Sequence, residues 1–263
     1  MRRYFLTGCT GFLGRAIIAD LLSRPDTEHI CLMTRWQQVS TNPRISFHVG
    51  DIVESPLPGA EFTHIIHGAN GSHATDPALC YYTIVEGTRR IADWASGNAE
   101  ILYLSSGGVH RETPYGRGKR LAEKLLPYRA KIARIYTLVG PDTPTHYAVG
   151  EFIRQALMEG RIRVTGGENI VRSYLHVDDA ARWVLRVLDD GYPSTPYDIG
   201  GDSPWTVRSV AVAVANVFQV PLEAYGSSSQ ADSYLPDVAA TKRLGLKSTI
   251  SLTQALERIR AKH

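Results

Sequence analysis

Three side chains near the middle of the chain have the types and spacing needed to move a proton to or from a carbonyl or hydroxyl oxygen. An apolar run at Ile101–Leu104 leads into Ser105-Ser106-Gly107-Gly108, and Tyr115 and Lys119 follow a few residues later. Residues four apart lie on one helical face, and an ammonium beside a phenol favours the phenolate, which lowers the pKa of the tyrosine toward working pH. A serine hydroxyl nearby can hydrogen-bond the same substrate oxygen. We therefore expect Ser106, Tyr115 and Lys119 to be catalytic, although such a tyrosine–lysine pair also occurs at the start of a surface helix.

The start of the chain has the features of a dinucleotide-binding turn. Apolar Tyr4–Leu6 precedes Gly8, Gly11 and Gly14, and a helical pattern continues to Ser23. Glycines let the backbone turn sharply and approach a pyrophosphate, whose charge the N–H groups at the positive end of the helix then hold. The alternative is a tight strand-to-helix turn without a ligand, but this context favours a dinucleotide. A nicotinamide would supply the hydride that complements proton transfer by the tyrosine.

The first half of the chain alternates between two patterns that predict an α/β fold. Apolar runs typical of buried parallel strands lie at Tyr4–Leu6, Ile30–Met33, Ile45–Val49, His64–His67, Ile101–Leu104 and Ile132–Leu138. Helical patterns lie at Gly14–Ser23, Pro77–Ser96 and Gly118–Leu126. This alternation predicts a Rossmann-type, doubly wound parallel sheet.

The second half has a different character and predicts a smaller C-terminal α/β lobe. Helices are expected at Ala148–Glu159, Val177–Leu188, Val207–Phe218 and Ser251–Ala261, with short strands near Ile162–Val164 and Tyr197–Ile199. The segment Gly140-Pro141-Asp142-Thr143-Pro144 is a strong break. We therefore expect a dinucleotide-binding domain over residues 1–140 and a substrate-binding lobe over residues 141–263, with some of the chain crossing back to the first domain.

The composition is that of an ordinary globular protein and excludes several other classes. The chain has 263 residues and a net charge of +3, and we find no dense Lys/Arg block that would indicate nucleic-acid binding. Its three cysteines lack metal or disulfide spacing and indicate a reducing compartment, with Cys9 and Cys31 expected to be small apolar fillers. No apolar run approaches the ~20 residues needed to cross a bilayer. We expect a cytoplasmic protein with no metal site and no membrane partner.

These motifs together resemble the extended short-chain dehydrogenase/reductases, in particular the NAD(P)-dependent epimerases and dehydratases that act on nucleotide sugars. The resemblance covers essentially the whole chain. It is carried by Thr7–Gly14, Gly50-Asp51-Ile52, His67-Gly68-Ala69-Asn70, Ser106, the Tyr115/Lys119 pair, the stretch from Arg134 to Pro141 and the stretch from Arg172 to Ala180.

The resemblance implies roles for residues in both halves of the chain. The implied cofactor-binding residues are Gly8, Thr10, Gly11, Phe12, Leu13, Gly14, Thr34, Arg35, Asp51, Ile52, His67, Gly68, Ala69, Tyr115 and Lys119. The implied substrate-binding residues are Asn70, Ser106, Gly107, Thr137 and Arg172, with Arg172 pairing with the substrate diphosphate. A guanidinium matches phosphate oxygens in a two-point contact, although a surface arginine is the plainer alternative. His176 is expected to be structural, and Asp178 and Asp179 to cap a helix.

The chain departs from the family pattern at several positions. Thr34-Arg35 stands where NAD-preferring members usually carry an acidic residue, and since arginine attracts a 2′-phosphate, NADP(H) is preferred and NAD(H) possible. Gly107-Gly108 replaces the Asp-Glu pair of the dehydratases, which disfavours 4,6-dehydration. The loop before Tyr115 is short, and Ile84 and Thr137 replace frequent asparagines.

We therefore expect NADPH-dependent reduction of a nucleotide-activated keto-sugar. The closest alternative is a nucleotide-sugar epimerase that uses a retained NAD(P). A reductase of a non-sugar carbonyl and a non-catalytic dinucleotide sensor are further alternatives. The resemblance also implies a homodimer through the helices at Pro77–Ser96 and Gly118–Leu126, for which ordinary packing against the sheet is the alternative.

Overall fold

The computed structural model describes residues 1–59, 61–70, 76–95, 97–126, 128–226 and 231–263, and these residues form two compact units. The first unit contains Met1–Ile135 and Ala181–Tyr197, and the second contains Tyr136–Ala180 and Asp198–His263. The chain therefore leaves the first unit after Ile135 and later returns to it for one segment. That the first unit binds cofactor and the second binds substrate stays a prediction.

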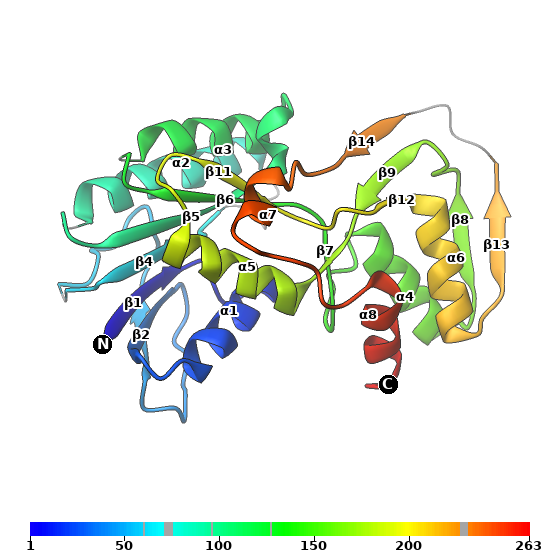
Figure 1. Ribbon diagram of the computed structural model, residues 1–263, viewed down its shortest axis with the longest axis horizontal. Coiled ribbons are helices and arrows are strands. Elements are labelled where there is room, and N and C mark those ends of the chain that lie inside the picture. The colour runs from blue at the N-terminus through cyan, green and yellow to red at the C-terminus, as the bar shows by residue number, and fades with distance from the viewer. Residues whose placement is uncertain (60, 71–75, 96, 127, 227–230) are drawn as a thin grey trace. The chain divides into compact units, whose positions relative to one another are not determined.

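A seven-stranded sheet organises the first unit, with the strand order β11-β6-β5-β4-β1-β2-β3 (Figure 1). Its strands are β1 (Arg2–Thr7), β2 (Thr27–Thr34), β3 (Ile45–Val49), β4 (His64–His67), β5 (Glu100–Ser106), β6 (Lys131–Ile135) and β11 (Pro196–Ile199). Strand β1 pairs in parallel with both β2 and β4, and β2–β3, β4–β5 and β5–β6 are also parallel. Because the chain starts in the middle of the sheet and winds outward in both directions, the expected Rossmann-type fold is confirmed.

Helices cover both faces of this sheet. They are α1 (Phe12–Ser23), α2 (Pro77–Trp94), the short 3₁₀ helix η1 (Gly107–His110), α3 (Pro114–Leu125) and the part of α5 (Val177–Asp190) that belongs to the first unit. Helices α2 and α3 run side by side on one face, and α1 lies on the other (Figure 1). Under α2, the ring of Phe5 lies 5.3 Å from that of Phe62 and 5.0 Å from that of Trp94, centroid to centroid.

The second unit is built from short strands and several helices. Its further strands are β7 (Leu138–Val139), β8 (Ile162–Thr165), β9 (Ile170–Ser173), β10 (Leu175–His176), β12 (Pro204–Thr206), β13 (Leu222–Tyr225) and β14 (Asp232–Tyr234). Its helices are α4 (Ala148–Glu159), α6 (Val207–Phe218), α7 (Ala239–Arg243) and α8 (Leu252–Arg260). Apolar residues of α4, α6 and α8 form one buried cluster that includes Phe152, Val214 and Leu256.

The predicted elements differ from the structure in a few places with clear physical causes. The strand expected at Ile132–Leu138 is two strands, because β6 ends at Ile135 and β7 pairs in parallel with β10 instead. Helix α3 starts at Pro114 rather than Gly118, since the Thr113 hydroxyl accepts the N–H of Gly116 and proline favours the first helical turn. The helix expected at Pro77–Ser96 ends at Trp94, and Ser96 lies outside the described residues.

Strands β9, β10 and β12–β14 were not expected at all, because such short segments carry too little periodicity to predict. Among the described helices, none has the combined length and hydropathy that crossing a bilayer requires.

Candidate active site

The glycine turn has the shape of a cradle for an anion. Gly8 has a φ of +68°, which an L side chain rarely adopts, and a Cβ there would lie 2.4 Å from the Ala69 nitrogen. A Cβ on Gly14 would lie 2.0 Å from the Cys9 carbonyl oxygen, so this glycine lets α1 approach the turn. A Cβ on Gly11 would meet no described atom within 4 Å. The space above Gly11 is where a pyrophosphate could approach the backbone.

Among the described residues, no side chain caps the N-terminus of α1. Gly11 is its N-cap residue and offers no side-chain oxygen to the first N–H groups of the helix. Thr10 and Gly11 are exposed, and Phe12 and Leu13 are half-buried. Uncapped N–H groups together with the positive end of the helix favour a bound phosphate. These residues fit the pyrophosphate of a dinucleotide.

A buried hydrogen-bond chain through His67 fixes the strand ends on either side of this turn. The Ala69 N–H donates to the Thr7 hydroxyl oxygen (3.3 Å), which lies 2.7 Å from Nδ1 of His67. The His67 Nε2 lies 3.1 Å from the Thr88 hydroxyl oxygen, whose own proton goes to the Ile84 carbonyl (2.7 Å). Burial and the charge of Lys119 lower the pKa of His67 to about 3, so the ring is neutral. In this series of hydrogen bonds, Nε2 of His67 carries the proton and Nδ1 accepts from the Thr7 hydroxyl.

The residues expected at the adenosine end lie at the carboxyl ends of β2 and β3. Thr34 is buried and its hydroxyl donates to the Trp36 carbonyl (2.8 Å), whereas Arg35 is exposed. The Asp51 carboxylate accepts the N–H of Val53 (2.8 Å), which shapes the turn after β3. Ile52 is buried, and its Cγ1 would lie 3.1 Å from a Cβ on Gly87. In the segment after β4, Gly68 is buried and Ala69 and Asn70 are half-buried.

Ser106 and Tyr115 converge on Gly108. Ser106 ends β5 and is 8% exposed, and its hydroxyl oxygen accepts the N–H of Gly108 at 3.0 Å. A Cβ on Gly108 would lie 3.2 Å from both the Ser106 Oγ and the Tyr115 Cε1. Any larger residue at position 108 would crowd Ser106 and Tyr115, so glycine there lets these two side chains lie close to the backbone. Accepting a hydrogen bond strengthens the serine hydroxyl as a donor, and Gly107 is buried beside it.

Lys119 lies beneath the tyrosine with almost no exposure. Its side chain is 1% exposed and its Nζ donates to the Leu104 carbonyl oxygen at 2.8 Å. The same Nζ lies 4.7 Å from the ring centroid of Tyr103 and 5.9 Å from that of Tyr115. Burial lowers the pKa of Lys119 to about 7, because the apolar surroundings penalise the charged form. A lysine so placed changes charge close to neutral pH.

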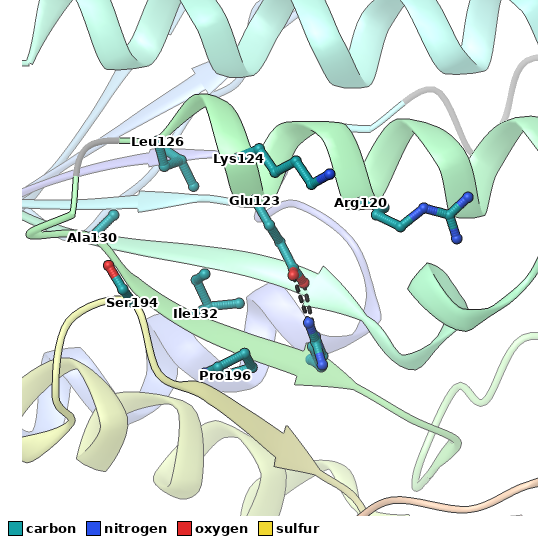
Figure 2. Close-up of a pocket in the computed structure, with 9 residues that line it drawn as sticks. Arg120, Glu123, Lys124, Leu126, Ala130, Ile132, Ser194 and Pro196 are labelled. Carbon is teal, nitrogen blue, oxygen red and sulfur yellow. Dashed lines mark hydrogen bonds and ion pairs between the residues drawn. The ribbon is translucent and has the colours of Figure 1, made fainter.

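One turn further along α3, Glu123 anchors the helix to the sheet. Its carboxylate accepts from Nε (2.9 Å) and Nη2 (2.7 Å) of Arg134 on β6, and from the Ser105 hydroxyl (2.6 Å) on β5. Dashed lines in Figure 2 mark contacts of the Glu123 carboxylate at the wall of a pocket of about 270 Å³, which is lined by residues of α3, β6, β11 and the loops beside them. Since Lys119 and Glu123 are one turn apart, this anchor sets the position of the lysine on the sheet.

The remaining predicted site residues belong to the second unit. Thr137 is half-buried, and its carbonyl oxygen accepts the N–H of Leu175 (3.2 Å). The Arg172 guanidinium pairs with the carboxylate of Asp232 (2.6 Å). His176 is 2% exposed and its Nδ1 accepts the N–H of Asp178 (3.2 Å), in keeping with a structural role.

Asp178 and Asp179 lie in the first turn of α5, as expected, and the carboxylate of Asp179 also makes a tertiary contact. This carboxylate accepts the N–H groups of Thr249 and Ile250 and the Thr249 hydroxyl, at 2.7, 3.1 and 2.6 Å. Asp179 is fully buried and joins α5 to the segment before α8. This tertiary partner lies 70 residues away in the chain, so the sequence pattern of the helix could not show it.

Comparison with known proteins identifies the family. Residues 4–200 match the model of the NAD dependent epimerase/dehydratase family, which is most of the chain. The chain belongs to this family. The match confirms the resemblance expected from the motifs, and with it that the protein is an enzyme of the extended short-chain dehydrogenase/reductase type that uses a nicotinamide dinucleotide.

Several curated proteins are similar to it in sequence. The dTDP-glucose 4,6-dehydratase of Streptomyces antibioticus is 26% identical, over 82% of this chain and 77% of that protein. UDP-glucuronic acid decarboxylase 2 of Arabidopsis thaliana is 25% identical, over 97% of this chain and 66% of that protein.

Several solved structures have the same fold. A dTDP-glucose 4,6-dehydratase (DesIV) of Streptomyces venezuelae superposes with a TM-score of 0.84 at 21% identity, covering 99% of this chain and 96% of that one. RMD from Pseudomonas aeruginosa, solved with NADPH, gives a TM-score of 0.78 at 23% identity, covering 99% of this chain and 98% of that one. These likenesses confirm the α/β architecture.

Two carboxylates that contact predicted site residues or their neighbours were not singled out from the sequence. Glu123 could have been found, since it follows Lys119 by four residues on the predicted helix and is followed by an arginine on the next strand. Asp232 carried no such signal, because it lies 60 residues from Arg172 in the chain.

Proposed function

We propose that this enzyme reduces the carbonyl group of a nucleotide-activated keto-sugar with NADPH. The observation that carries the proposal is the arrangement around Gly108, where the Ser106 Oγ and the Tyr115 ring both lie 3.2 Å from the position that a Cβ would take. Two hydroxyl groups on neighbouring side chains, with a buried lysine below, can serve one substrate oxygen.

The side chains of this site would have distinct roles in the reduction. A bound reduced nicotinamide would supply the hydride that adds to the carbonyl carbon. Ser106 would orient the carbonyl oxygen through a hydrogen bond, and Tyr115 would donate its phenolic proton to that oxygen as it becomes an alkoxide. Lys119 would stabilise the resulting phenolate when charged and hold the ribose of the cofactor. The half-buried tyrosine would then regain its proton from solvent.

The preference for NADPH is supported by the end of β2. Thr34 is buried there and Arg35 is exposed, so the site presents a cation where a carboxylate would repel a 2′-phosphate. Among the structural neighbours, RMD was solved with NADPH and DesIV with NAD. The charge of Arg35 in this chain decides our choice between the two.

A nucleotide sugar is supported by the names of the relatives and by Arg172. The relatives include a dTDP-glucose 4,6-dehydratase and a UDP-glucuronic acid decarboxylase, whose names both contain a nucleotide sugar. Arg172 would contact the substrate diphosphate. Dehydration itself is disfavoured, because Gly107 and Gly108 carry no group that can transfer a proton.

The test is to incubate the protein with NADPH and a panel of UDP- and dTDP-4-keto-sugars while following NADPH absorbance. We expect stoichiometric loss of NADPH, and a fall in rate of roughly 10²–10⁴-fold in Tyr115→Phe. Tyr128→Phe is the matched control, since Tyr128 is 88% exposed.

The other outcomes separate the alternative functions. An isomerised sugar with no net NADPH loss would support an epimerase instead, which the same side chains could serve and which structural neighbours such as a UDP-N-acetylglucosamine 4-epimerase from Bacillus cereus represent. Turnover of aromatic ketones alone would identify a non-sugar reductase. Dinucleotide binding without any turnover would identify a sensor.

A further inference from the structure

The guanidinium of Arg172 is already partly occupied by its own chain. Its Nη1 donates to the carbonyl oxygens of Val171 (2.8 Å) and Asp232 (3.1 Å), and its Nη2 donates to the Asp232 carboxylate (2.6 Å). A guanidinium carries five N–H groups, one on Nε and two on each Nη. Within the described residues, these three contacts leave the Nε–H and one N–H of Nη2, which suffice for one two-point contact with a phosphate.

The sheet register of the second unit delivers Asp232 to this arginine. Strand β14 pairs in parallel with β9, so that Asp232 stands opposite Ile170 and Tyr234 stands opposite Arg172. Alternate residues of a strand share one face, and the Asp232 side chain therefore lies on the same face as Arg172, two positions along. The Asp232 N–H also donates to the Asn169 carbonyl oxygen (3.0 Å), which fixes the backbone that carries the carboxylate.

The ring of Tyr234 completes the surroundings of the arginine. Its centroid lies 5.8 Å from the Arg172 Cζ and 4.7 Å from the ring centroid of Tyr136. The arginine and Asp232 side chains are 21% and 30% exposed, so the pair is only partly screened by water. A carboxylate at this position cancels most of the attraction that Arg172 alone would exert on an anion.

We propose that Asp232 is a specificity-determining residue of the substrate site, which opposes a phosphorylated ligand at Arg172. This inference rests on the proposed role of Arg172 in binding the diphosphate. Asp232 holds the guanidinium in place for one two-point contact and repels the phosphate charge at the same time. The site therefore binds a nucleoside diphosphate more weakly than an unpaired arginine would, and the penalty grows with each phosphate charge.

The experiment compares the wild type with Asp232→Asn, which keeps an oxygen that can accept from Arg172 and removes the negative charge. Dissociation constants are measured by calorimetry for uridine, UMP and UDP and for the matching thymidine series, on the whole protein with saturating NADPH. We expect UDP or dTDP to bind about tenfold more tightly to Asp232→Asn, the monophosphate to gain less and the nucleoside to gain nothing.

Two further variants make the result specific. Asp190→Asn removes the same charge from an exposed ion pair with Arg186 and is expected to leave all the affinities unchanged. Arg172→Gln is expected to weaken UDP and dTDP without affecting the nucleosides. Thermal melting of each variant reports whether it is folded.

Each other pattern overturns a defined part of the argument. If Arg172→Gln weakens UDP or dTDP but Asp232→Asn leaves their affinity unchanged or lowers it, Asp232 is a purely structural partner and the inference is wrong, while the proposed function stands. If Asp232→Asn tightens nucleoside and diphosphate equally, the charge argument is wrong. If no variant binds a nucleoside diphosphate, the proposed substrate class itself fails.

Discussion

Replacing Gly11 by alanine should separate cofactor binding from folding. A Cβ on Gly11 would meet no described atom within 4 Å, and its backbone angles (φ −82°, ψ −168°) are open to alanine. The added methyl group would therefore clash with none of the described residues in the protein alone. In the complex it would stand where the pyrophosphate must approach the backbone N–H groups at the start of α1.

The magnitudes follow from these contacts. Replacing glycine by alanine at a compatible position stabilises the folded protein by about 0.4–1 kcal/mol, because it lowers the conformational entropy of the unfolded chain. Alanine is a poorer N-cap residue than glycine, which destabilises the protein by a similar amount. We expect the free energy of unfolding without cofactor to change by less than about 1 kcal/mol, or roughly 4 °C in Tm. Keeping the phosphate away from the helix N-terminus should weaken NADPH by at least ~100-fold, about 2.8 kcal/mol.

The assay is a pair of measurements on Gly11→Ala, namely thermal melting without cofactor and a fluorescence titration with NADPH. Gly14→Ala is the control that should lose stability, because its Cβ would lie 2.0 Å from the Cys9 carbonyl oxygen. It should lose about 3 kcal/mol or more of stability, at the upper end for overpacking a core. Undiminished NADPH binding by a folded Gly11→Ala protein would refute the placement of the pyrophosphate.

Three further predictions concern charge. Burial lowers the pKa of Lys119 in the folded protein to about 7 from 10.5. Between these pH values the unfolded chain binds a proton that the folded chain has lost. The free energy of unfolding therefore increases by up to about 1.4 kcal/mol per pH unit as pH rises through that range. Lys119→Met should flatten this rise in urea unfolding at pH 7.5 and 9.5, and an unchanged slope would contradict the assignment. Glu123→Gln should lower the unfolding free energy by roughly 3 kcal/mol, since it removes the carboxylate charge of a mostly buried ion pair with Arg134. Glu112→Gln, at an ion pair where Glu112 is 74% exposed, should change it by less than about 0.5 kcal/mol. Equal losses in chemical denaturation would argue against the anchor. Arg35→Glu should weaken NADPH at least about tenfold and spare NADH, as measured by titrating both, because only NADPH carries the 2′-phosphate. A parallel loss of both cofactors would show that Arg35 does not contact that group.

Several elements of both units follow from local patterns in the sequence. Strands β3 and β4 and helices α4 and α6 have the predicted bounds, because each is an apolar run or an amphipathic pattern with clear ends. The Tyr115/Lys119 spacing likewise placed both residues on α3. What failed were segments whose conformation depends on partners far along the chain, such as β9 and β14.

Local sequence determined the glycine turn, the strands of the main sheet and the residue types of the proton-transferring set, since these depend on backbone sterics and on periodicity within a few residues. Only the tertiary structure decided how the charges are balanced. It buried Lys119 deeply enough to lower its pKa to about 7, and it set the carboxylates of Glu123 and Asp232 against Arg134 and Arg172. The physical reason is that burial and electrostatic pairing depend on distances in space. Residues such as Arg172 and Asp232, which are 60 positions apart in the chain, come close together only when the sheets form.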